Sequence, residues 1–315
     1  MSETAVVTAF LRNRGEVLLL CRSDAVGSYP GRWGAVAGHA EGAPEESARQ
    51  EIREETGLTL DQVTLVRAGE PFGAPDTELG RRWRVHPFLF DCESRDIELN
   101  WETERAEWVS PPAMLARDTV PGLWKSYDRV RPTVETVEED REHGSTYVSM
   151  RALAVLRDEA ALATRREQAG TTVASLESEV SAAPPGQSVP AVARELLTAR
   201  PSMTAVLNRI HRAMAAADGP MDVEDTAQEG IERAASVDRE AAANAAALVG
   251  ERVATLSRSG TVRQTLAAAD PERVLVAESR PGREGVGVAV DFAGDLLAEQ
   301  AVTLTTDAAF AAELA

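Results

Sequence analysis

The stretch Gln50-Glu51-Ile52-Arg53-Glu54-Glu55-Thr56-Gly57-Leu58 decides the expected fold around it. It ends a predicted helix over 44–56, which has proline at its first position, acidic residues in its first turn and glycine just past its end. Glu51, Glu54 and Glu55 are spaced i, i+3 and i+4, so their carboxylates share one helix face. Because like charges repel, a cation would stabilise this face, and carboxylate oxygens suit Mg²⁺ or Mn²⁺. The alternative is a solvated acidic face.

Strand-like segments lie on both sides of this helix. Residues 6–12 and 16–22 are apolar and are separated by the tight-turn sequence Asn13-Arg14-Gly15, which predicts a hairpin. Further strands are expected over 63–68, 84–90 and 107–109, and a short helix is expected over 111–116. We therefore expect residues 1–131 to form one mixed α/β domain.

Four sequence motifs flank the acidic helix, three before it and one after it. In order, they are Val17-Leu-Leu-Leu-Cys-Arg22, Pro30-Gly-Arg-Trp-Gly34, Ala37-Gly-His-Ala-Glu41 and Trp108-Val-Ser-Pro111. With the acidic helix, they resemble the Nudix hydrolase family, whose signature is G-x5-E-x7-R-E-U-x-E-E-x-G-U, with U aliphatic. The positions that match this signature are Gly38, Glu51, Ile52, Glu54, Glu55, Gly57 and Leu58.

This resemblance implies an α/β/α sandwich with a mixed sheet and hydrolysis of a nucleoside-diphosphate-linked substrate. It assigns Glu51, Glu54 and Glu55 to metal binding and catalysis with Mg²⁺ or Mn²⁺, and it places Gly38 beside the substrate. Such a cation could clamp a diphosphate and activate a water for attack on phosphorus. Glu104 is a further candidate metal ligand or base.

Two departures from the signature leave a second function open. Gln50 replaces the arginine that braces the catalytic glutamates, and the loop before Pro44 is two residues short, so Gly42 falls near the position of the first signature glutamate. Supporting groups of this kind can be worth roughly 10–100-fold in metal affinity or activity. The alternative is a domain that binds such a ligand without hydrolysing it.

The middle of the chain is predicted to be helical. Residues 147–179 have helical composition with a break near Gly170, and further helices are expected over 203–217 and 223–249. The breaker cluster 182–188 is the best candidate for a linker. We expect 132–190 to be a helical connector and linker, followed by a helical part over 191–250.

Three short apolar strands follow, over 253–256, 274–277 and 302–304. Helix-like segments between them indicate a Rossmann-like parallel sheet over 251–315. The first strand runs into a turn with small hydroxyls, an arginine and a glycine, and the second ends in Ser279-Arg280. Such turns suit a phosphate at a helix start, and parallel strand ends lie on one rim. The alternative for each is an ordinary strand-to-helix turn.

Together with Arg200-Pro201-Ser202, these turns resemble the initiation factor 2B alpha/beta/delta-like family, which also contains sugar-phosphate isomerases. The resemblance covers about 150–315 and implies a pocket for a nucleotide or sugar phosphate, and a homodimer or hetero-oligomer formed through this domain. The phosphate-binding residues that it predicts are Arg200, Ser257, Arg258, Ser259, Gly260, Thr261, Ser279 and Arg280.

Isomerase activity is the less favoured interpretation. The first turn lacks the isomerases' catalytic cysteine, and the segment that carries their catalytic aspartate has no counterpart here. A three-stranded sheet also leaves an exposed edge. We therefore expect either a truncated product or a partner that covers this edge.

Composition restricts the classes of partner. With 51 acidic and 33 basic residues the formal net charge is −18, and Lys125 is the single lysine. This charge argues against broad nucleic-acid or anionic-membrane binding. An acidic, alanine-rich chain with arginine in place of lysine resembles proteins of halophilic archaea. Without an apolar run of roughly 20 residues, and with two cysteines only, we expect a soluble, cytoplasmic protein.

Overall fold

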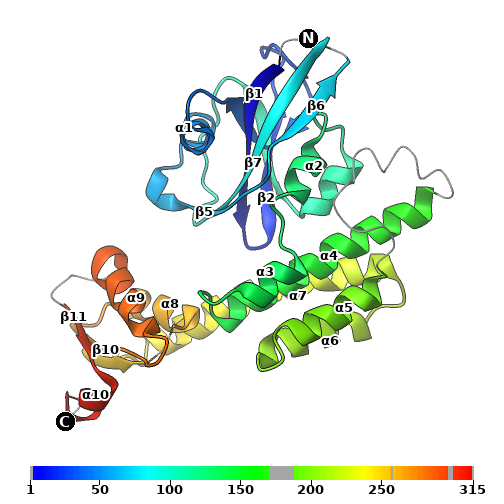
Figure 1. The fold of residues 1–315 in the computed structure, drawn as a ribbon. Helices are drawn as coiled ribbons and strands as arrows, with labels where there is room; N and C mark the ends of the chain where they lie inside the picture. Colours follow the sequence, from blue (N-terminus) through cyan, green and yellow to red (C-terminus); the bar gives the residue numbers. More distant parts are fainter. Residues whose placement is uncertain (1–2, 78, 170–187, 257, 297–300, 314–315) are drawn as a thin grey trace.

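The computed structural model describes residues 3–77, 79–169, 188–256, 258–296 and 301–313. Figure 1 shows three parts in chain order: a β-rich domain, a layer of helices and a small sheet near the C-terminus. The linker predicted over 182–188 and the predicted break near Gly170 lie outside the described residues. Among the described helices, none combines the length and the apolar character needed to cross a bilayer.

The N-terminal domain is built on a mixed eight-stranded sheet with the path β3-β2-β1-β7-β5. Its central strands, β1 (Glu3–Asn13) and β7 (Arg81–Cys92), pair in parallel, whereas the other pairings are antiparallel. The remaining strands are β2 (Glu16–Arg22), β3 (Trp33–Gly34), β4 (Val36–His39), β5 (Val63–Ala68), β6 (Phe72–Asp76) and β8 (Thr103–Val109). The predicted hairpin at Asn13–Gly15 is confirmed, and β6 is a strand that the sequence pattern did not indicate.

Helices cover both faces of this sheet, because its central strands carry apolar side chains on both faces. Leu18 and Leu20 of β2 pack toward α1 (Pro44–Thr56) and its Ile52. Val17 and Leu19 pack toward the other face, with the 3-10 helix η2 (Pro111–Ala116) and α2 (Leu123–Asp128). A short 3-10 helix, η1 (Leu60–Gln62), precedes β5. This is the predicted α/β/α sandwich.

The described residues of the middle part form five helices around one apolar core. They are α3 (Val134–Glu139), α4 (Ser145–Ala169), α5 (Val189–Ala199), α6 (Thr204–Ala215) and α7 (Pro220–Ala246). Residues of α3 and α4 share this core with residues of α5, α6 and α7. The helices on the two sides of residue 190 therefore pack as one unit.

The C-terminal part is a three-stranded parallel sheet in the order β11-β10-β9. Its elements are β9 (Arg252–Thr255), α8 (Gly260–Ala269), β10 (Arg273–Ala277), α9 (Glu284–Asp291), the π-helical turn η4 (Phe292–Leu296), β11 (Val302–Thr305) and α10 (Asp307–Glu313). The predicted strand–helix alternation is confirmed. A Cβ at Gly285 would lie 1.8 Å from the carbonyl oxygen of Ala277, so α9 approaches β10 where only glycine fits.

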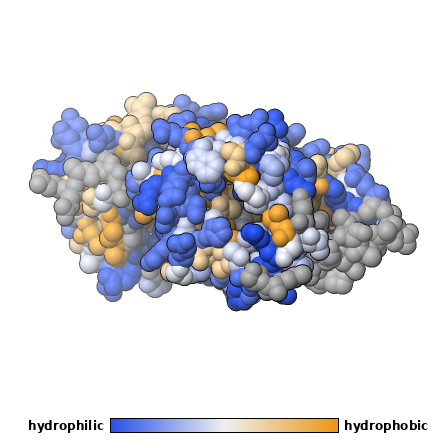
Figure 2. Space-filling view, turned by 90° about the horizontal axis from the view of Figure 1, so that it is seen from above, coloured by the Kyte–Doolittle hydropathy of each residue, from blue (hydrophilic) through white to orange (hydrophobic). Residues whose placement is uncertain are grey.

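The N-terminal domain and the helical part are packed together. The turn between β1 and β2 points at the helices in Figure 1. Buried Arg157 of α4 donates hydrogen bonds to the Gly15 carbonyl (2.8 Å) and to Gln228 Oε1 (2.9 Å), and it pairs with Asp158. Leu162 of α4 belongs to the same apolar core as Tyr127 of α2. Figure 2, seen from above, shows a mainly hydrophilic face with hydrophobic residues in separate patches.

Candidate active site and phosphate-binding turns

The acidic helix face is divided between buried and exposed carboxylates. Ile52 and Ala48 anchor α1 in the core, and Gly57 ends the helix in the left-handed region while its N–H donates to the Arg53 carbonyl. Glu55 is buried, Glu51 is half-buried and Glu54 is exposed. The three carboxylates therefore share a helix face but differ in their contact with solvent.

Gly38 and Glu51 are in direct contact. A Cβ at position 38 would lie 1.8 Å from Glu51 Oε1, so the carboxylate of Glu51 occupies the space that any larger residue would need. Gly38 is placed there by the antiparallel pairing of β4 with β1, which also lets the Ala37 N–H donate to Glu55 Oε1 at 3.1 Å. The structure thus brings Gly38, Glu51 and Glu55 together.

A cleft of about 700 Å³ opens beside this contact. Glu41, Glu51 and Glu102 supply acidic groups to its wall, and Arg22 and Arg81 supply basic groups. Tyr29, Trp83 and Trp101 add aromatic surface, and Trp101 is 66 % exposed. Small-molecule sites commonly combine such apolar surface with a few polar groups.

Burial and mutual repulsion alter the acidity of these glutamates. Burial and the nearby carboxylates of Glu51 and Glu102 raise the pKa of Glu55 to about 8, against the opposing hydrogen bond from Ala37. Burial, followed by the charges of Glu54, Glu102 and Glu41, raises the pKa of Glu51. Negative charge is therefore concentrated here without full compensation from cations.

These residues fit a divalent cation by the chemistry of their donors. The available ligands are carboxylate oxygens, the type that Mg²⁺ and Mn²⁺ prefer, and a cation would relieve the repulsion that raises the pKa values of Glu51 and Glu55. Within the described ranges, however, no three His, Cys, Asp or Glu side chains are gathered closely enough to hold a metal ion. Binding would require these side chains to converge.

The structure distinguishes Glu102 from Glu104, the residue predicted from the sequence. Glu102 lines the cleft, whereas Glu104 is exposed on β8 and is not among the cleft residues. The pairing of β2 with β8 shifts register between Cys21 and Arg22, which leaves Glu104 without a paired residue on β2. The sequence contains both acidic residues, but it does not reveal this local irregularity.

Gln50 forms a local bond with the exposed end of the acidic face. Its Nε2 donates to Glu54 Oε1 at 2.8 Å, one helical turn further along. A glutamine there supplies a neutral hydrogen bond and no positive charge. The residue that replaces the signature arginine thus contacts Glu54, while Glu51 and Glu55 keep their raised pKa values.

At the C-terminal rim, the donors of the second turn already have partners. The backbone N–H groups of Ser279 and Arg280 donate to the two oxygens of Asp307, at 2.8 and 2.7 Å. The Arg280 guanidinium pairs with Glu278 at 3.0 Å, and Arg283 pairs with the same carboxylate at 2.6 Å. Acidic side chains therefore hold the groups that were predicted to bind phosphate.

The first turn caps a helix. Ser259 accepts a weak hydrogen bond from the Val262 N–H at the start of α8, where Gly260 is the first residue, and Thr261 donates to Asp238 of α7. Ser257 lies outside the described residues.

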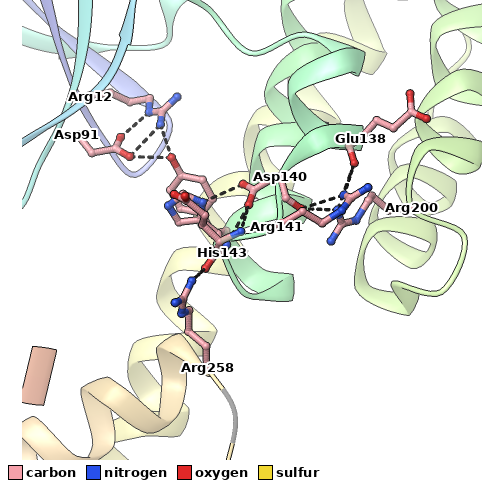
Figure 3. A network of polar contacts seen from close by, with 10 residues as sticks. Arg12, Asp91, Glu138, Asp140, Arg141, His143, Arg200 and Arg258 are labelled. Atoms are coloured by element: carbon pink, nitrogen blue, oxygen red, sulfur yellow. Dashed lines mark hydrogen bonds and ion pairs between the residues drawn. The ribbon is translucent and has the colours of Figure 1, made fainter. Parts of the chain in front are cut away.

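Arg200 and Arg258 contact the backbone that joins α3 to α4. Arg258 Nη1 donates to the Glu142 carbonyl at 2.6 Å, and Arg200 Nη1 donates to the carbonyls of Glu138 and Asp140. Figure 3 shows both arginines reaching this segment from different elements. The two arginines therefore hold the connection between α3 and α4, within the helical part.

Comparison with known families accounts for both parts of the chain. Residues 1–130 match the model of the NUDIX domain, and residues 141–315 match that of the initiation factor 2 subunit family. The second match covers more than half of the 315 residues. The chain belongs to the initiation factor 2 subunit family. In this family member, a NUDIX domain precedes the family region.

The structure of this initiation factor 2 subunit family protein is similar, over its NUDIX part, to several solved structures. A MutT protein from Methanosarcina mazei Go1 is 26 % identical over 40 % of this chain and 89 % of its own, with a TM-score of 0.33. An Ap4A hydrolase from C. elegans is 20 % identical over 41 % of this chain and 94 % of its own, with a TM-score of 0.34. A comparison with curated proteins gave no match.

Several polar residues of this family member were not predicted from the sequence. Glu102 is separated from the acidic helix by about a third of the NUDIX domain, and Arg151 and Arg157 lie within the apolar run of α4. A charged residue inside an apolar helical run is a usable signal, because such a residue is rarely buried without a purpose. The partner of each, however, depends on the tertiary contacts.

Proposed function

We propose that the NUDIX domain hydrolyses a phosphoanhydride bond in a nucleoside-diphosphate-linked substrate, with Mg²⁺ or Mn²⁺. The observation that carries this proposal is the contact between Gly38 and Glu51 at the wall of the cleft, with Glu55 buried beside it. Glu51 and Glu55, with Glu102, are the residues that would hold the cation. When bound, the cation would neutralise diphosphate charge and acidify a water.

The cleft offers groups suited to the other parts of such a substrate. Arg22 and Arg81 supply positive charge for phosphate oxygens, and Trp83 and Trp101 supply aromatic surface for a base. Arg22 is oriented by a 2.8 Å hydrogen bond from its Nε to the Ser28 carbonyl.

A panel of nucleotide sugars, dinucleotides and nucleoside triphosphates tests this proposal. Phosphate or nucleotide release is measured with the full chain in molar KCl and Mg²⁺, because the acidic composition favours a salt-rich assay. We expect turnover that EDTA abolishes and that Glu51→Gln lowers by at least about tenfold. Glu54→Gln is a second variant, and exposed Glu104→Gln is the matched control. No turnover across the panel, or turnover indifferent to Glu51→Gln and Glu54→Gln, would overturn the proposal.

A second candidate is a regulatory protein that binds a nucleotide or sugar phosphate without catalysis. Two observations favour it: Gln50 gives Glu54 a neutral partner, and the described acidic side chains are not gathered around a metal position. Calorimetric titration with AMP, GMP and pentose phosphates tests it. Binding that is lost in Arg258→Ala, without turnover of any substrate, would support this function over hydrolysis.

We also propose that the C-terminal part associates with a second copy of the chain. Leu256, Val290 and Leu304 are 58, 66 and 44 % exposed there, and burial of such side chains favours association. Light scattering on the eluting protein should give about twice the monomer mass. Leu256→Glu should shift the mass toward that of the monomer, and a monomeric parent protein would refute this arrangement.

A further inference from the structure

A cavity of about 340 Å³ lies where the NUDIX domain meets the helical part. Arg12, Arg67 and Val130 line it from the NUDIX side, and Asp140, Tyr147 and Arg151 line it from the helical side. Figure 3 shows the polar network along its border, from Arg12 and Asp91 through His143 to the segment held by Arg200 and Arg258. The cavity is separate from both the NUDIX cleft and the Ser279–Arg280 turn.

Arg151 of α4 has hydrogen-bonding capacity that the described protein atoms do not use. The residue is 8 % exposed, and its buried Nε and Nη1 atoms have no hydrogen-bond partner among the described residues. Its guanidinium lies 5.0 Å from the centre of the Tyr147 ring. Burial of a cationic hydrogen-bond donor without partners costs free energy, so Arg151 is a candidate for binding a ligand.

Arg151 is nevertheless charged near neutral pH. Burial, reinforced by the charge of Arg12, lowers its pKa to about 10. Arg12 cannot accept its hydrogen bonds, because arginine has donors only. Asp91 lies close enough to act on Arg151 through its charge, but its carboxylate is held by Arg12, at 2.6 and 2.9 Å, and by the Tyr147 hydroxyl at 2.9 Å.

The other charged groups around the cavity are mostly paired or lie at its exposed mouth, and Arg67 is the exception. Arg131 is paired with Asp128 and Glu159, each at 2.7 Å, and Asp140 is paired with His143 at 2.9 Å. Half-buried Arg67 forms no ion pair with another described residue, and the carboxylates of Glu135 and Glu139 act on it only at longer range. Glu139, Arg141 and Glu142 lie at the exposed mouth, where solvent screens them.

We propose that this cavity binds a small phosphate-bearing molecule, whose phosphate accepts hydrogen bonds from Arg151 and interacts with Arg67. Two guanidinium groups without a carboxylate partner among the described residues match a dianion, whereas chloride or a monocarboxylate would leave one uncompensated. The apolar lining that includes Val130 would contact the rest of the molecule, and the volume suits a ligand of sugar-phosphate size. Because both domains line the cavity, the ligand would hold them together.

Thermal unfolding and calorimetry of the full chain test this site. The probes are inorganic phosphate and ribose 5-phosphate, with acetate and chloride at matched ionic strength. We expect phosphate and ribose 5-phosphate to raise the Tm beyond the effect of acetate or chloride. Equal responses to all four anions would overturn the proposal.

The decisive variant is Arg151→Met, with Arg239→Met as the matched control, because Arg239 is exposed on α7 and lines neither this cavity nor the NUDIX cleft. Arg151→Met should weaken phosphate binding at least tenfold, and its Tm without phosphate should equal or exceed that of the parent, because an unsatisfied buried charge has been removed. Arg239→Met should bind phosphate like the parent. If Arg151→Met fails to fold, Arg67→Gln should still weaken binding. Phosphate binding that is unchanged in a folded Arg151→Met or Arg67→Gln chain would contradict this site.

Discussion

The guanidinium of Arg157, on α4, donates a 2.8 Å hydrogen bond to the backbone carbonyl of Gly15, at the turn between β1 and β2. The same turn packs against α7, where a Cβ at Gly15 would lie 2.4 Å from Ile231 Cγ2. Gly15 also has a φ of +83°, which L-residues other than glycine rarely adopt. A single turn thus joins the NUDIX domain to two helices of the family region.

Replacing Gly15 should destabilise this junction. We expect Gly15→Ala to lower the free energy of unfolding by roughly 2–4 kcal/mol, from backbone strain and from displacement of Ile231. Urea unfolding followed by tryptophan fluorescence measures the change. Gly80→Ala is the control, because Gly80 also has a positive φ, +64°, but a Cβ there would meet no atom of the described residues within 4 Å. Equal effects of the two substitutions would show that the contact with Ile231 contributes nothing.

Gly38 should be required for catalysis more than for folding. An added methyl group must displace the Glu51 carboxylate, so Gly38→Ala should reduce hydrolysis by at least about tenfold while the far-ultraviolet circular dichroism stays unchanged. Gly27→Ala serves as the control in the same cleft, because a Cβ there would have no neighbour within 4 Å in the described part of the chain. Full activity of a folded Gly38→Ala chain would show that hydrolysis does not require the contact between Gly38 and Glu51.

Glu102 and Glu104 provide a matched pair of carboxylates on neighbouring positions. Glu102 lines the cleft and contributes to the raised pKa values of Glu51 and Glu55, whereas Glu104 is outside the cleft. Glu102→Gln should reduce activity roughly 10–100-fold and weaken Mg²⁺ binding. Glu104→Gln should leave both within about twofold. If Glu104→Gln reduced activity more than Glu102→Gln in steady-state assays, Glu104 and not Glu102 would belong to the site.

Asp91 should make the domain junction sensitive to acid. Burial by itself would raise its pKa, but the charge and hydrogen bonds of Arg12, with Arg151 and Tyr147, outweigh burial and lower the pKa from 3.8 to about 2. Because the folded pKa lies below the unfolded one, Asp91 stabilises the fold above about pH 4, and this contribution disappears as the pH falls toward 2. With its side chain 32 % exposed, we expect about 1–2 kcal/mol.

Unfolding midpoints between pH 6 and pH 2 check this expectation. The parent chain should lose more stability over this interval than Asp91→Asn, which has no carboxylate to protonate at that position. Exposed Asp61→Asn controls for the loss of one negative charge. Parallel pH profiles for the parent and Asp91→Asn would rule out this contribution.

The local sequence determined much of the secondary structure of this protein and the spacing of its acidic residues. Three local features depend on residues close together in the chain: the continuous apolar run of β2, the proline and glycine that bound α1, and the i, i+3, i+4 spacing of Glu51, Glu54 and Glu55. The same holds for the alternation of strands and helices after Arg252. Such patterns follow from backbone geometry and from the burial of one face, so they are readable without a structure.

Only the tertiary structure decided which side chains meet. It placed Glu102 in the cleft and left Glu104 unpaired at a register shift. It also paired Asp307 with the backbone of Ser279 and Arg280, and directed Arg200 and Arg258 to the 138–142 segment. It also buried Arg151 beside Arg12, which lies 139 positions earlier in the chain (151 − 12). Charge partners and burial depend on contacts between distant segments, and no local spacing encodes those contacts.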